Sequence, residues 1–279
     1  MATTAQVSTR GDDVGEPLTE RSGRVAAARR LTRRAGRDDA GAFLAEGRQA
    51  VSEALALAAT DPGAVREVFA TEAAAAAHRD LLAGTAVPVR LVTERAAAGL
   101  SETVTPQGLV AVCALRDVPP GDLLAAPPPL AVGLAGLADP GNAGTVLRTA
   151  DACGAGAVVF GAGSADPYGG KAVRASAGSL FHVDVVRGAP LLPLVGDLRA
   201  RGVTVLAADG GGEAALDGLG SALAGPVLWL FGNEARGVPP ELAAAADARV
   251  RIPMRGRAES LNLAAAAAIC LYATQLAQG

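Results

Sequence analysis

From residue 130 onwards, short continuous apolar runs alternate with helix-like segments, and this alternation constrains the fold more than any other feature. The apolar runs include LAVGLAGL, GAVVFG, VTVLAAD and PVLWLFG. Strands that are apolar along their whole length are typical of parallel sheets covered by helices on both faces. Residues 130–279 are therefore predicted to form an α/β domain around a mostly parallel sheet.

The preceding part of the chain predicts a smaller α/β unit. FLAEGRQAVSEALALAA is typical of a short strand that enters a helix, and VREVFAT, PVRLVT and LVAVCAL are typical of further strands. The proline-rich passage VPPGDLLAAPPP is expected to sustain neither a helix nor a central strand, and so to act as a linker. The predicted organisation is a disordered tail at 1–20, a domain at 21–115, a linker at 116–129 and a second domain at 130–279.

Charge is unevenly distributed near the start of the chain. The formal net charge is only -3, so the protein as a whole is not a polycation. Between Arg21 and Arg37, however, there are seven arginines and no acidic residue. This segment is either a solvated, partly disordered arm or an arm or first helix that contacts phosphate, and charge by itself leaves the two interpretations level.

Neither a metal site nor a membrane segment is indicated. The three cysteines are far apart and flanked by apolar residues, and the chain has only two histidines. We expect reduced cysteines in the core and no metal. No apolar run reaches the roughly 18 residues that cross a bilayer, and the first 30 residues contain no apolar signal-peptide region. The sequence thus predicts a cytoplasmic protein with no membrane partner.

Three polar clusters follow predicted strands of the larger domain. ADPGNAGTVLRTA contains Asn142, at an expected helix N-cap, and Arg148. FGNEARGVPP contains Glu234, and IPMRGRAESLNLA is expected to start a helix at Ser260 with Asn262 in its first turn. Because ligands of parallel sheets bind beyond the carboxyl ends of the strands, the three clusters are predicted to share one site.

Common cofactor and hydrolase motifs are missing from the sequence. No GxGxxG opens a helix after a strand, and neither GxxxxGK[ST] nor GxSxG occurs. The scarcity of histidine argues against imidazole acid–base catalysis. Dinucleotide-binding, nucleoside-triphosphate-binding and serine-hydrolase functions are therefore disfavoured.

The three clusters together resemble the motifs of the SpoU, or TrmH-like, branch of the SPOUT RNA methyltransferases. DPGNAGTVLRTA is similar to the first motif, FGNEARGVP to the second and IPMRGRAESLN to the third. The resemblance extends over residues 130–279 and includes KAVRASAGSLFHVDV. Residues 29–112 also resemble, through shorter strings, the substrate-binding domain of this family. Asp139 and Ala264 depart from the usual pattern.

The resemblance implies transfer of a methyl group from S-adenosylmethionine to a ribose 2'-hydroxyl of structured RNA, with 23S ribosomal RNA as the first choice. It also implies a deep trefoil knot and a homodimer that uses the C-terminal helix. Carried over by position, the cofactor would lie against Gly232, Ile252 and Leu261. The implied catalytic residues are Arg148, Asn142, Glu234, Ser260 and Asn262.

Several questions stay open at this point. Arg148 is either a general base or a charged group that stabilises the oxyanion, and the second role suits a guanidinium that keeps its proton. A tRNA ribose methyltransferase of the same branch and an rRNA methyltransferase that confers antibiotic resistance are alternatives. A non-catalytic RNA-binding protein is the alternative from another class.

Overall fold

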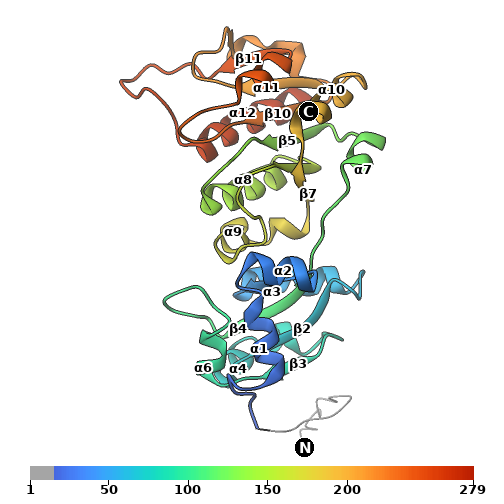
Figure 1. Cartoon of the computed structure of the whole chain (residues 1–279), viewed down its shortest axis with the longest axis vertical. Helices are drawn as coiled ribbons and strands as arrows, with labels where there is room; N and C mark the ends of the chain where they lie inside the picture. The colour runs from blue at the N-terminus through green and yellow to red at the C-terminus, as the bar shows by residue number, and fades with distance from the viewer. Residues whose placement is uncertain (1–15) are drawn as a thin grey trace, which may run out of the picture. The chain divides into compact units, whose positions relative to one another are not determined.

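The computed structural model describes residues 16–279, and the chain divides into two compact units that meet between Leu115 and Arg116 in the sequence (Figure 1). Residues 1–15 of the predicted disordered tail lie outside the described residues. The prediction is wrong for residues 16–20, because the backbone N–H of Leu18 donates to the Leu91 carbonyl at 2.8 Å and its carbonyl accepts from Thr93 at 3.0 Å. These bonds add a short bridge beside a strand of the first sheet.

The first unit is built on a four-stranded sheet in the order β1-β4-β2-β3. Its strands pair antiparallel except for β2 and β3, which run parallel. The strands are β1 (Ala42–Glu46), β2 (Val65–Ala70), β3 (Val89–Leu91) and β4 (Leu109–Ala114). The helices that follow them are α3 (Arg48–Ala58), α4 (Glu72–Ala77), α5 (Arg79–Leu82) and α6 (Glu94–Ala98). The predicted α/β unit is thereby confirmed.

The arginine-rich segment forms two helices, α1 (Gly23–Arg30) and α2 (Arg34–Ala40). Val25, Ala28 and Leu31 recur at a spacing of three and are buried in the core of the first unit. Because this apolar stripe anchors the segment, a partly disordered arm is the wrong interpretation. The arginines project from ordered helices instead.

The proline-rich passage contains a helix that the sequence analysis excluded. Helix α7 (Pro120–Ala125) begins with a proline at its first position, where the missing N–H costs nothing. Leu123 is buried, and the backbone N–H of Val118 donates to Val185. The prediction of a passage without helix was therefore wrong, since proline excludes helix interiors and not helix starts.

The second unit contains a seven-stranded sheet in the order β7-β6-β5-β10-β8-β11-β9, and every pair of neighbours is parallel. This confirms the predicted parallel sheet, whereas the trefoil knot stays a prediction. The strands are β5 (Leu130–Leu134), β6 (Ala157–Gly161), β7 (Asp184–Ala189), β8 (Thr204–Ala208), β9 (Ala214–Ala215), β10 (Val227–Phe231) and β11 (Ala248–Arg251).

Helices cover both faces of this sheet. Leu228 and Leu230 share a core with side chains from α7, α10 (Leu191–Arg199) and α11 (Pro240–Ala245). Helices α8 (Pro140–Ala152), α9 (Gly170–Ser176) and α12 (Leu263–Gln278) pack together, and α12 contacts β10. On this side the indole N–H of Trp229 donates to Thr274 at 2.8 Å, which satisfies the buried polar group of the largest core side chain.

Two of the three cysteines lie in the core as expected. Cys113 and Cys270 are buried, and burial raises the pKa of both thiols, to about 12 for Cys270. Cys153 is only partly buried, at the end of α8. Within residues 16–279, no helix has both the length and the apolar composition that a bilayer crossing demands.

Candidate active site

The three polar clusters follow β5, β10 and β11 at the carboxyl edge of the parallel sheet. The segment after β5 leads into α8, the loop 232–239 follows β10, and residues 252–262 join β11 to α12. Strands β5 and β10 are direct neighbours, and β8 separates β10 from β11. The topology therefore brings the first cluster to the second and third clusters, which lie more than 90 residues later in the sequence.

Asp139, rather than the predicted Asn142, is the N-cap of α8. Its carboxylate accepts from the backbone N–H of Asn142 at 2.9 Å, and Pro140 occupies the first helical position. The prediction was wrong because the helix begins three residues earlier than the polar pattern suggested. Because Asp139 supplies the cap, the side-chain amide of Asn142 is available for another contact.

A similar correction applies to α12, where Asn262 and not Ser260 is the N-cap. The Asn262 side-chain oxygen accepts from Ala264 at 2.9 Å and from Ala265 at 3.3 Å. The helix begins at Leu263, so Ser260 lies in the preceding loop. Capping uses the oxygen of Asn262 and leaves its amide nitrogen free to donate elsewhere.

Hydrogen bonds join the three clusters into one network. Asn142 Nδ2 donates to Glu234 Oε1 at 3.0 Å, and Asn262 Nδ2 donates to Asn142 Oδ1 at 3.3 Å. Glu234 also accepts from the backbone N–H groups of Ala138 and Asp139, both at 3.3 Å. Asn142 thus uses both ends of its amide to connect the second motif with the third.

The network keeps Glu234 ionised. Partial burial raises the pKa of Glu234, whereas hydrogen bonds from Asn142 and from backbone N–H groups lower it. The hydrogen bonds outweigh burial, so the pKa lies below its ordinary value. At neutral pH the residue is a carboxylate that accepts hydrogen bonds. Its place in the site is therefore that of an acceptor which positions Asn142 and the start of α8.

Asn233, to which sequence analysis gave no role, shapes the loop after β10. Its amide nitrogen donates to the Gly136 carbonyl at 2.9 Å, and its side-chain oxygen accepts from Ala235 at 3.0 Å. Its backbone exchanges hydrogen bonds of 3.0 and 2.8 Å with Gly237. The signal for this role was the pair of glycines that flank the segment, which is typical of a tight loop.

The structure gives a specific reason for glycine at position 232. A Cβ at this position would lie 1.9 Å from the carbonyl carbon of Gly237 and 2.1 Å from the Val238 nitrogen. The loop folds back so closely that any side chain would overlap its own backbone. Sequence analysis attributed this glycine to the approach of a cofactor, whereas the return of the loop already requires it.

Other predicted site residues lie near the same edge but outside the network. Arg148 is exposed two turns along α8, and within residues 16–279 its side chain has no hydrogen-bond or ion-pair partner. Ser260 is exposed in the loop before α12 and makes no hydrogen bond to the network. Ile252 follows β11 and is half-buried, and Leu261 is 39% exposed. The network itself therefore comprises Asn142, Glu234 and Asn262.

Two features of the site were missed. Lys171, the single lysine of the chain, lies 2.7 Å from Asp139 and lowers the pKa of that carboxyl group, together with the backbone bond from Asn142. The loop at 209–212 follows β8, between the ends of β10 and β11. The run of three glycines in this loop was a sequence signal for it. No local sequence pattern indicated the ion pair between Lys171 and Asp139.

A parallel α/β sheet whose strand ends carry these three joined motifs is the arrangement implied by the resemblance to RNA methyltransferases that use S-adenosylmethionine. The model of the SpoU rRNA Methylase family matches residues 129–272, and the model of the MRM3-like substrate binding domain matches residues 23–111. The chain belongs to the SpoU rRNA methylase family. The resemblance found in the motifs is thereby confirmed for both parts of the chain.

Characterised relatives include the 23S rRNA (guanosine(2553)-2'-O)-methyltransferase RlmP of Bacillus subtilis. It is 37% identical over 230 residues, which cover 82% of this chain and 87% of that protein. The 23S rRNA (uridine(2479)-2'-O)-methyltransferase of Streptomyces viridochromogenes is 36% identical over 48% of this chain and 47% of its own length.

Solved structures of similar proteins include two with bound cofactor. The AdoMet-bound rRNA methyltransferase from Sinorhizobium meliloti matches with a TM-score of 0.78 and 31% identity, over 94% of this chain and 97% of that one. AviRb from Streptomyces viridochromogenes, in complex with AdoMet, matches with a TM-score of 0.77 and 28% identity, over 91% and 98% of the two chains.

Proposed function

We propose that the protein transfers the methyl group of S-adenosylmethionine to a ribose 2'-hydroxyl of 23S ribosomal RNA. The observation that carries this proposal is the hydrogen-bonded connection of Asn142, Glu234 and Asn262, which unites three motifs from separate strand ends. The similarity to RlmP, over most of both chains, favours ribosomal RNA over the tRNA alternative.

The second part of the proposal concerns the residues that receive the cofactor. Ile252 and Leu261 offer apolar surface at either end of the loop 252–262. Within the described part of the chain, residues 254–261 make no hydrogen bonds, so their backbone groups are available to a purine and a ribose. Gly232, which directly follows β10, is buried and would contribute backbone groups alone. These residues suit S-adenosylmethionine, which supplies an electrophilic methyl group on a sulfonium.

Arg148 is proposed as the catalytic residue. The ribose hydroxyl is a weak acid, so its oxygen must be stabilised as it passes its proton to solvent water and attacks the methyl carbon while the carbon–sulfur bond breaks. A guanidinium keeps its own proton and stabilises the developing negative charge by charge-assisted hydrogen bonds. The exposure of Arg148 and its lack of a partner within residues 16–279 leave it available for RNA.

Asn142, Asn262 and Glu234 are proposed to fix the start of α8 and α12 around the reacting groups. Ser260 lies one residue before Leu261 and is proposed to donate its hydroxyl to cofactor or ribose. The first unit is proposed as the RNA-binding domain, which its match to a substrate-binding domain supports. Action on ribosomal RNA would place the protein in the cytoplasm.

A homodimer is proposed through α12. This helix buries one side, including Ala267 and Leu271, in the second unit. Ile269, Tyr272 and Leu276 lie at helical spacing on the other side and are 40%, 55% and 66% exposed. An apolar stripe of this kind on a terminal helix suits a second copy of the chain. Light scattering of Tyr272→Glu should report a monomer where the wild type is a dimer.

The function is tested in two steps. Calorimetric titration with S-adenosylmethionine is expected to show binding at one site per chain, and absence of binding would favour the non-catalytic RNA-binding alternative. Incubation with a transcript of 23S rRNA and with total tRNA, followed by mapping of 2'-O-methyl groups, should then mark a single ribose in the 23S transcript. Modification confined to tRNA would instead establish the tRNA alternative.

A further inference from the structure

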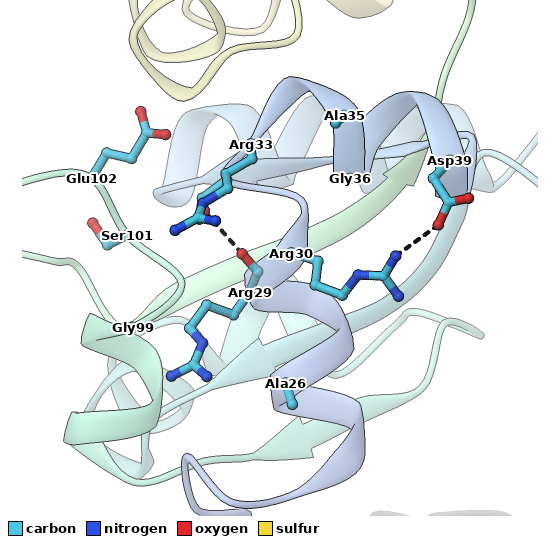
Figure 2. Close-up of a pocket in the computed structure, with 11 residues that line it drawn as sticks. Ala26, Arg29, Arg30, Arg33, Ala35, Gly36, Asp39, Gly99, Ser101 and Glu102 are labelled. Atoms are coloured by element: carbon cyan, nitrogen blue, oxygen red, sulfur yellow. Dashed lines mark hydrogen bonds and ion pairs between the residues drawn. The ribbon is translucent and has the colours of Figure 1, made fainter.

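The first unit contains an open hollow that the methyl-transfer site does not use. It has a volume of about 890 Å³ and lies between helices α1 and α2 and the segment 99–102 (Figure 2). Its charged and hydroxyl-bearing lining residues are Arg29, Arg30, Thr32, Arg33, Asp39, Ser101 and Glu102. Three arginines therefore face a hollow that also carries two carboxylates.

The three arginines are not equivalent. Arg30 turns away to Asp39, with 2.7 Å between Nη2 and Oδ2, so these two charges offset each other. Arg29 and Arg33 extend toward the side where Ser101 and Glu102 lie (Figure 2). Both are exposed, and neither side chain has a hydrogen-bond or ion-pair partner in the part of the chain that the structure describes. Two guanidinium groups thus stand ready for an anion from outside.

The backbone around the hollow is held in place by interior contacts. Arg37 is buried, and its Nη1 donates to the carbonyls of Leu31 and Thr32 at 2.9 and 3.1 Å, which fixes the turn between the helices. A Cβ on Gly36 would lie 2.1 Å from the Arg30 carbonyl oxygen, so α2 crosses the end of α1 in backbone contact. The positions of Arg29 and Arg33 are therefore set before any ligand binds.

The opposite wall is fixed as well. Ser101 Oγ donates to Glu46, and Thr103 Oγ1 donates to the same carboxylate oxygen at 3.1 Å. The carboxylate of Glu102 is exposed at this wall and would repel a phosphate placed against it. An anion is therefore expected to bind nearer the helices than this wall.

We propose that this hollow, through Arg29 and Arg33, binds the phosphate backbone of the RNA substrate. The inference rests on the proposed function, since it names the surface by which the first unit would hold that RNA. Guanidinium groups suit phosphate because their planar forks donate two hydrogen bonds at once. The hollow is open and larger than one phosphate requires, which suits a strand passing through it.

The test compares two double charge reversals in the full chain. Arg29→Glu with Arg33→Glu removes the proposed contacts. Arg21→Glu with Arg79→Glu is the matched control, because both of these arginines are exposed, have no side-chain partner within residues 16–279 and do not line the hollow. Both variants carry the same net charge. The probe is a transcript of the 23S rRNA segment around guanosine 2553, the position in the name of the Bacillus subtilis relative.

Fluorescence anisotropy over a salt series is expected to show the hollow variant binding the transcript about tenfold or more weaker than the control variant. The slope of log K against log salt should fall by about 1.5, as expected for two lost phosphate contacts. Arg29→Lys with Arg33→Lys should retain most of the slope. Equal affinity and equal slope for the hollow and control variants would overturn the proposal.

Titration with S-adenosylmethionine separates this inference from the proposed function. The cofactor residues lie in the second unit, so the hollow variant should bind S-adenosylmethionine as the wild type does. Weak RNA binding with normal cofactor binding supports the hollow. If the wild type bound RNA through the hollow but transferred no methyl group, the hollow would stand and the methyltransferase proposal would fail.

Discussion

The hollow on α1 and α2 and the network at the strand ends of the second unit use polar side chains in opposite ways. In the network, Asn142, Glu234 and Asn262 form hydrogen bonds with one another, and these bonds hold the three side chains in one geometry. In the hollow, Arg29 and Arg33 lack partners among the described residues and project from a rigid support. The first arrangement specifies geometry, whereas the second supplies charge. Loss of the network should therefore affect the rate, and loss of the hollow should affect RNA affinity and its salt dependence.

Arg148→Ala should produce the largest change in rate. The exposed guanidinium belongs neither to the hydrogen-bond network nor to the hollow, and its proposed role is to stabilise the oxyanion in the transition state. Removing such a donor typically lowers kcat by about 100-fold or more. Single-turnover methylation measures the rate, and calorimetry should show unchanged binding of S-adenosylmethionine. The control is Arg201→Ala, an exposed arginine after α10 whose side chain, among the described residues, bonds only the Asp197 carbonyl. Normal turnover by the Arg148 variant would show that Arg148 is not the catalytic residue.

Gly232→Ala should produce the largest loss of stability. The added methyl carbon would meet backbone atoms of Gly237 and Val238, which cannot turn aside as a side chain can. Overpacking of this kind costs about 1–3 kcal/mol, and the displaced loop should also lower activity. Thermal unfolding and methylation assays measure both effects. Gly225→Ala, before the same strand, is the control because an added Cβ there meets no atom within 4 Å. A Gly232 variant as stable as this control would contradict the loop geometry.

Glu234→Gln should lower kcat by about tenfold, because the glutamine amide would face Asn142 or the Ala138 and Asp139 N–H groups as a second donor. The pKa of Glu234 lies below its ordinary value, so its contribution to stability is present above pH of about 4.3 and is lost as the pH falls through the folded-state pKa.

A pH–rate profile between 6 and 9 should therefore show no titration of Glu234. Glu241→Gln, an exposed acid at the start of α11, serves as the control and should have wild-type activity. A wild-type rate for Glu234→Gln, or an inflection that this substitution removes, would indicate a different role for the carboxylate.

Lys171→Met should have the smallest effect. The Lys171 and Asp139 side chains are 58% and 45% exposed, so their ion pair contributes at most about 1 kcal/mol. Since Lys171 lowers the pKa of Asp139, the contribution exists above the ordinary pKa of the carboxyl group and disappears as the pH falls. In a double-mutant cycle with Asp139→Asn, which preserves a cap residue, the two changes should be non-additive at low salt. Strict additivity in urea unfolding would mean that the pair does not contribute.

The sequence predicted much of the second unit because its signals are local and repeated. Each buried parallel strand is an apolar run, and each motif follows one strand end. Helix starts were less predictable: Asn142 and Ser260 were expected as caps, and Asp139 and Asn262 perform this role. A polar run such as ADPGN offers several residues that can cap a helix, and the choice depends on where the chain leaves the strand.

The first 40 residues show the same limit from another side. Seven arginines left a solvated arm and a phosphate-contacting arm or helix equally open, although Val25, Ala28 and Leu31 already carried the spacing of a buried stripe. Three apolar residues among many charges are a weak signal until a sheet is present to pack against. The hollow between α1, α2 and residues 99–102 could not be predicted, because its walls are about 70 residues apart in sequence.

By itself, the sequence determined the family, the parallel sheet and the residues from which the site is drawn, since these depend on apolar periodicity and on motifs that are contiguous in the chain. Tertiary structure decided which of those residues touch. It joined Asn142 to Glu234 and Asn262, paired the single lysine with Asp139, and left Arg29, Arg33 and Arg148 without partners within residues 16–279. These outcomes depend on the order of the strands and on the packing of the helices, which set distances between residues that no local pattern connects.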